Sequence, residues 1–217
     1  MAKKEAAKSL KSANFLWLCS IVTFDVVVLA VIVFPDVVGS ISASNITLAR
    51  SISSVLLPVV PLLLTNTVPQ LMKARLVFWR WSNPNPGARA FSKYVHDDDR
   101  INVDKLREHV GAFPSDPKEQ NSFWYALYKR VENEVAVSDA HKAFLLYRDM
   151  ASLSVLLLFL TAVVMGIWHF EWQEIGKAIA VFLGQYLLTM VSARVAGERF
   201  VCTVLSIHST RKVPNPK

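Results

Sequence analysis

Recognisable catalytic patterns are missing from this chain of 217 residues. It contains no GxSxG, HExxH, CxxC, Walker-loop or GxGxxG sequence, and its five histidines are scattered along the chain. No nucleophilic side chain has an evident base near it in the sequence. We therefore expect a protein that is not an enzyme and that has neither a cofactor nor a metal site.

Charged residues are also few, at 19% of the chain, whereas 53% of the residues are hydrophobic and only seven are glycine. Four apolar runs cover residues 15–34, 51–71, 151–168 and 178–193. About 20 apolar residues cross the roughly 30 Å of a bilayer core, so these runs predict four transmembrane helices. A soluble protein with four such runs would lack polar surface, and the first run is too long for a cleavable signal peptide.

Lysine and arginine concentrate on one side of the predicted helices. Four precede the first run, thirteen lie between the second and third, and five follow the fourth; only Arg50 and Lys177 fall in the other connections. This excess predicts that both termini and the middle segment are cytoplasmic in a multi-pass protein of the plasma (inner) membrane. Cys19 and Cys202 then lie near the cytoplasmic face, where we expect no structural disulfide.

The predicted fold class is an all-α membrane protein with four transmembrane helices and a mostly helical cytosolic insert between helices 2 and 3. Its expected parts are a basic cytosolic N-terminus (1–14), helices 1 and 2 (15–71), the insert (72–150), helices 3 and 4 (151–193), and a cytosolic helix extension and tail (194–217).

Capping signals divide the insert. Asp99 or Asn102 is expected to cap a short helix that Gly111 ends, and Ser115 or Asp116 is expected to cap the next one. Helix should then run into the third span with at most one break, in the stretch 134–144, where Ser138 or Asp139 is expected to cap a new segment. Beyond the fourth span, an apolar stripe is expected to pack against the insert; it consists of Phe200, Val201, Val204 and Leu205.

The stretch 73–94 combines basic and aromatic residues without any acidic residue. One interpretation is an interfacial anchor, with tryptophans at headgroup depth and cations on lipid phosphates. The other is a surface for an anionic ligand, such as a nucleotide or single-stranded nucleic acid stacked on aromatic rings. The candidate residues for either role are Lys73, Arg75, Trp79, Arg80, Trp81, Arg89 and Lys93. A second crowded group, which either packs or forms a binding face, comprises Trp124, Tyr125, Tyr128, Lys129 and Arg130.

Asp25 is a carboxylate in the middle of the first apolar run. It lies roughly 15 Å from the cytoplasmic end of its helix, and Thr161 and Gln185 are expected at similar depth. Either could hydrogen-bond Asp25 and so join helices. Alternatively, Asp25 faces a hydrated path in which several copies form a cation-attracting ring.

Three functions are considered. The first is an oligomeric pore-forming or membrane-disrupting effector controlled by its insert, as suggested by Asp25, by three prolines that predict a kink in the run 51–71, and by helix running from the insert into the third span. In architecture the chain resembles the small membrane effectors of bacterial antiviral systems, and this resemblance implies disruption of the inner membrane by a homo-oligomer.

The second function is a non-conducting membrane anchor or sensor subunit for a cytosolic protein partner, which fits the absence of catalytic residues and the aromatic-rich insert. A transporter is a third alternative, but four spans are few for one and the sequence contains no internal repeat.

Overall fold

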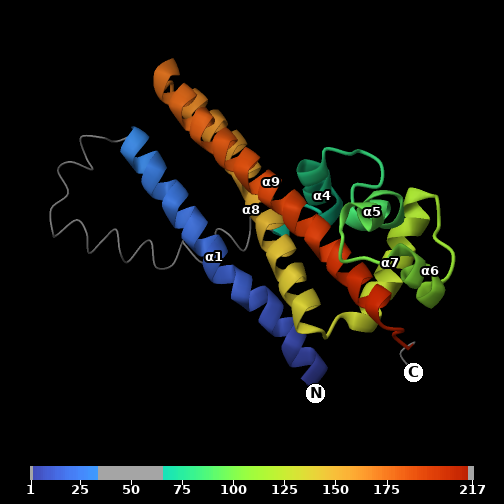
Figure 1. Cartoon of the computed structure of the whole chain (residues 1–217). Coiled ribbons are helices and arrows are strands. Elements are labelled where there is room, and N and C mark those ends of the chain that lie inside the picture. The colour runs from blue at the N-terminus through green and yellow to red at the C-terminus, as the bar shows by residue number, and fades with distance from the viewer. Residues whose placement is uncertain (1, 34–65, 215–217) are drawn as a thin grey trace. The chain divides into compact units, whose positions relative to one another are not determined.

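The computed structural model describes residues 2–33 and 66–214, and every regular element in these ranges is helical (Figure 1). Most of the predicted second span, residues 51–65, lies outside the described residues. The elements are α1 (Ala2–Val33), α4 (Gln70–Phe78), the 3-10 turn η1 (Pro86–Arg89), the π-helical turn η2 (Ala90–Tyr94), α5 (Val95–Asp97), α6 (Val103–Val110), α7 (Pro117–Val131), α8 (Val135–Ile167) and α9 (Trp172–Thr210).

Three of the described helices are long and apolar enough to cross a membrane: Asn14–Ile32 within α1, α8 and α9. At 1.5 Å per residue, the 33 residues of α8 and the 39 of α9 extend for about 50 and 60 Å. The hydrocarbon core of a bilayer is only about 30 Å thick, so both helices are longer than a single crossing requires. An all-helical protein with apolar, membrane-compatible helices is therefore confirmed for the part of the chain that the structure describes.

The chain divides into two compact units, and α8 and α9 contribute to both. Residues 1–69 and 149–189 form what we call the span unit, and residues 70–148 and 190–217 form the insert unit. The predicted insert covers 72–150, whereas the second unit combines 70–148 with 190–217.

The span unit is held together by apolar packing. Val22 of α1 packs with Leu153 and Leu157 of α8 and with Phe182 of α9. A second cluster formed by Met165, Ile175 and Ala178 closes the α8–α9 hairpin. Large apolar side chains on the outside stay exposed, among them Leu16, Phe24, Phe159 and Leu188. Such an apolar exterior is what a lipid environment requires.

The insert unit forms its helices where the capping signals predicted them. The side chain of Asn102 accepts a hydrogen bond from the Lys105 amide at the start of α6, and Gly111, with a φ of 95°, ends that helix. Asp116 accepts from two backbone amides at the start of α7, so it is the cap of this helix. All four residues of the predicted apolar stripe on α9 are buried, namely Phe200, Val201, Val204 and Leu205.

The predicted position of the helix break is wrong. Ser138 and Asp139 lie inside α8, and the break spans residues 132–134. A helix continued past Val131 would point Val135 along the same apolar stripe. The break shifts the phase instead, so that Val137 is fully buried and Val135 is 75% exposed.

Gly87 gives a direct test of packing in the insert unit. A Cβ at this position would lie 2.7 Å from the Oδ1 of Asn121 and 2.7 Å from the Trp124 ring. Gly87→Ala is therefore expected to destabilise the protein by about 1–3 kcal/mol, as overpacking does. Thermal unfolding in detergent measures this. Gly176→Ala is the matched control, because a Cβ there meets no atom within 4 Å. Equal melting temperatures for the two variants would contradict the packing described.

Candidate functional site

A polar cluster joins three described helices of the span unit, α1, α8 and α9, around Asp25. The Asp25 side chain is 1% exposed, and its Oδ2 accepts a hydrogen bond of 3.2 Å from the Nε2 of Gln185. The same amide nitrogen donates to the Oγ of Ser154 at 3.1 Å, and Ser154 donates to the carbonyl of Met150. The predicted bond between Gln185 and Asp25 is thus present. It connects α1, α8 and α9 through side chains that are far apart in the sequence.

One oxygen of the Asp25 carboxylate lacks a hydrogen-bond donor among the described residues. Oδ1 of Asp25 is buried and has no hydrogen-bond partner among the described residues, and the same is true of Oγ of Ser152. A buried polar atom without a partner costs about 1–3 kcal/mol, and more when it carries charge. An ionisable side chain kept at this depth despite that cost is a candidate functional residue.

Thr161 has a different environment from Asp25. It is buried on α8 and lines a cavity of about 400 Å³ together with apolar residues such as Leu29, Leu157 and Trp168. Of the two partners predicted for Asp25, the structure therefore brings Gln185 to the carboxylate and places Thr161 in an apolar cavity of the same unit.

The bond between Gln185 and Asp25 predicts coupled effects on stability. Gln185→Leu should destabilise the wild-type protein, because it leaves the buried carboxylate without its donor. In an Asp25→Leu background the same change should cost about 0.5–1.7 kcal/mol less, the range found for hydrogen bonds between membrane helices. Reversible unfolding in mixed micelles measures both effects. Equal costs in the two backgrounds would show that the two side chains do not interact.

The basic residues of 73–94 do not form one exposed cationic face. Lys73 is buried at 2% exposure. The Arg75 guanidinium donates to the carbonyl of Trp81 at 3.2 Å and lies 5.5 Å from that ring. Lys93 pairs with Asp97 at 3.8 Å. Local partners therefore hold several of these cations, which reduces their availability to an external anion.

The two tryptophans of this stretch are exposed. Trp79 is 60% and Trp81 is 78% accessible, whereas Phe91 and Tyr94 are buried. Trp79 has a positive φ of 52°. The Arg194 guanidinium lies 4.9 Å from the Trp79 ring, and it also donates a hydrogen bond to the carbonyl of Val77. Exposed indoles beside cations are typical of membrane–water interfaces. This geometry supports the interfacial interpretation more than a nucleic-acid surface.

A separate aromatic cavity of about 360 Å³ lies within the insert unit. Its walls include Trp124 and Tyr128 of α7, which stack with ring centroids 5.9 Å apart. His141 of α8 and Phe200 of α9 stack parallel at 4.7 Å. Tyr128 Oη and His141 Nδ1 share a hydrogen bond of 3.1 Å. We call this cavity the aromatic pocket.

Polar groups also line the aromatic pocket or belong to the side chains that form its walls. Asn85, Asn121 and Lys129 line it, and the indole nitrogen of Trp124 is buried with no hydrogen-bond partner among the residues that the structure describes. Burial raises the pKa of Tyr128, so its hydroxyl stays protonated and can donate. A hydrogen bond to Glu132 raises the pKa of Lys129, which therefore remains cationic. The pocket combines flat apolar walls with several donors and one cation.

The sequence indicated only some of the residues that line this pocket. The crowding of Trp124, Tyr128 and Lys129 on one helix is visible in the sequence, but His141 and Phe200 come from two other helices. No spacing rule links residues 12 to 76 positions apart. A signal was present only in the predicted packing of the Phe200 stripe against the insert.

Comparison with models of protein families, with curated proteins and with solved structures finds no match to this chain. Its function is therefore argued from the geometry of these sites.

Proposed function

We propose that the protein is a multi-span membrane protein that acts as a non-conducting sensor or anchor subunit, and that its aromatic pocket is the sensing site. The observation that carries this proposal is the pocket itself, which is built from three helices and retains an unpartnered indole donor. Its volume of about 360 Å³ falls in the range of small-molecule sites.

The lining favours a planar, anionic ligand of nucleotide type. Aromatic rings such as Trp124 and Tyr128 stack on bases. Lys129 lies 5.7 Å from the Tyr128 ring and pairs with Glu132 at 2.7 Å, so it would supply positive charge for a phosphate by exchanging this partner. The carboxamides of Asn85 and Asn121 offer the donors and acceptors that read the edge of a base. A cytosolic protein partner would then respond to the occupied pocket.

Ligand-induced stabilisation tests this proposal. Adenosine monophosphate and cytidine monophosphate should raise the melting temperature of the full-length protein in detergent, because a ligand that binds only the folded state stabilises it. Inorganic phosphate alone should not. Lys129→Gln should weaken the effect about fivefold or more in apparent affinity. Lys118→Gln, an exposed lysine on the same helix, is the control. No shift with either nucleotide, or equal weakening by both variants, would refute the proposal.

A second candidate is the oligomeric membrane-permeabilising effector. The unpartnered Oδ1 of Asp25 and the exposed apolar faces of the spans support it, because a rearrangement among copies could hydrate the carboxylate. The resemblance in architecture to membrane effectors of antiviral systems supports the same candidate. In this account the bonded Asp25 belongs to a closed form, and several copies together form the open path.

Flux through liposomes separates the two candidates. If the effector function holds, wild-type protein releases a trapped dye or ions, and Asp25→Asn and Asp25→Leu both insert and assemble but lose this activity. Asn preserves size and hydrogen bonding, so a loss with Asn identifies a role for the charge. Release by Asp25→Asn at the wild-type rate would leave Asp25 with a packing role only.

A further inference from the structure

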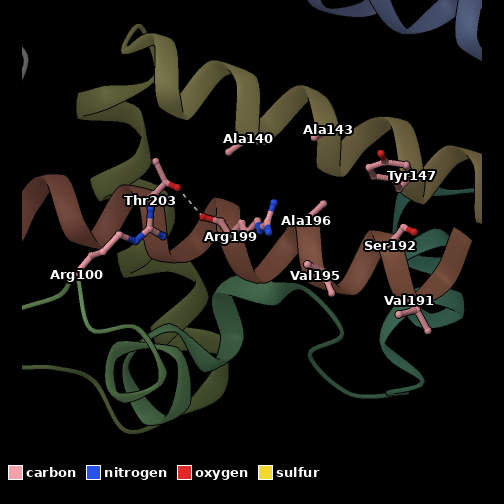
Figure 2. Close-up of a pocket in the computed structure, with 10 residues that line it drawn as sticks. All are labelled: Arg100, Ala140, Ala143, Tyr147, Val191, Ser192, Val195, Ala196, Arg199 and Thr203. Atoms are coloured by element: carbon pink, nitrogen blue, oxygen red, sulfur yellow. Dashed lines mark hydrogen bonds between the residues drawn. The ribbon is translucent and has the colours of Figure 1, made fainter. Parts of the chain in front are cut away.

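A larger cavity, of about 790 Å³, lies in the insert unit between the first part of α8 and the last part of α9 (Figure 2). Small side chains create it: Ala140 and Ala143 on α8 face Ala196 on α9. Because the side chains that face each other at these positions are methyl groups, the two helices leave space between them for a bound molecule.

The charge in this cavity has one sign. Arg100 and Arg199 line it, and no acidic residue is among its lining residues. Figure 2 shows the Arg199 side chain in the space between the two helices. Asp98 holds Arg100 through a contact of 2.6 Å, and this hydrogen bond lowers the pKa of Asp98 to about 2. The Asp98 carboxylate therefore stays ionised and keeps the Arg100 guanidinium in position, while Arg199 makes no ion pair with an acidic residue in the part of the chain that the structure describes.

The cavity is polar at one end and more apolar at the other. Both arginines lie toward the end near Thr203, whereas Val191, Val195 and Tyr147 extend toward the opposite end (Figure 2). Along α9 this order runs from the predicted membrane run, 178–193, outward into the cytosolic extension. On α8, Tyr147 precedes the run 151–168 by four residues. The apolar end is therefore the end nearer in sequence to the spans.

We propose that this cavity binds the headgroup of an anionic phospholipid of the cytoplasmic leaflet, with Arg199 and Arg100 on the phosphate and the apolar end beside the acyl chains. Basic pockets between membrane helices on the cytoplasmic side are suited to such headgroups. An inorganic anion would use the guanidinium groups but not the valine and alanine walls. The combined lining thus fits an amphiphile, and the site is distinct from the aromatic pocket proposed as the sensor.

Lipid retention by the full-length protein tests this site. Protein purified in neutral detergent is mixed with phosphatidylglycerol or phosphatidylcholine of equal chain length, and bound lipid is counted by native mass spectrometry. Wild-type protein should retain phosphatidylglycerol preferentially. Arg199→Gln should weaken this retention about fivefold, the contribution of one cation at an anionic surface. Ala143→Leu, which fills the cavity without changing charge, should weaken it as well.

Lys105→Gln, an exposed lysine on α6, removes the same charge away from the cavity and should retain lipid as wild type does. A second arm adds glycerol 3-phosphate as the soluble headgroup, which should not displace the lipid at equal concentration. The proposal is overturned if phosphatidylcholine is retained equally, if Lys105→Gln matches the loss of Arg199→Gln, if Ala143→Leu has no effect while folded, or if glycerol 3-phosphate displaces the lipid.

Discussion

A carboxylate among apolar helices must find donors within the protein, because lipid offers none. Asp25 meets this requirement through Gln185, and Gln185 extends the bond to Ser154. Because a hydrogen bond has a narrow range of distance and angle, it fixes the register of α1 against α8 and α9 more strictly than apolar packing does. The cluster of Val22, Leu153, Leu157 and Phe182 then adds the contact area around it.

The insert unit follows from the length of α8 and α9. Both helices are longer than is needed to cross a bilayer core, and their remaining turns pack within the insert unit. The segment 70–148 is too short to bury a large core by itself, so these turns add to its packing. Phe200 on α9 illustrates this, because it makes edge contacts with Trp124 and Tyr128 and stacks on His141. Both the aromatic pocket and the cavity between α8 and α9 are lined in part by residues of these two helices.

Sequence reasoning succeeded where one local rule dominates. The caps at Asn102 and Asp116, each predicted as one of two alternatives, and the stop at Gly111 depend on short-range backbone geometry. Depth counting along ideal helices gave Thr161 and Gln185 as the two possible partners of Asp25, and Gln185 is the one that bonds to it. It failed where tertiary packing decides. The break at 132–134 places Val137 in the core and leaves Val135 exposed, and no capping residue in the sequence signals its position.

Long-range contacts account for the other differences. Lys73 belongs by composition to a basic stretch, yet it is buried, and the aromatic pocket gathers residues from three helices. The predicted second span falls mainly on residues outside those described, so the four-span topology and the cytoplasmic position of the termini remain predictions from charge distribution.

The central claim is that Asp25 faces Gln185 inside one chain, and a cysteine crosslink in native membranes tests it most directly. In a Cys19→Ser, Cys202→Ser background, the pair Asp25→Cys and Gln185→Cys should form an intrachain disulfide on mild oxidation. Proteolysis of the insert would then leave the two fragments joined until reduction. The pair Phe24→Cys and Leu188→Cys, at two exposed positions, should not join them. Crosslinks between separate chains at positions 25 and 185, without intrachain product, would contradict the account.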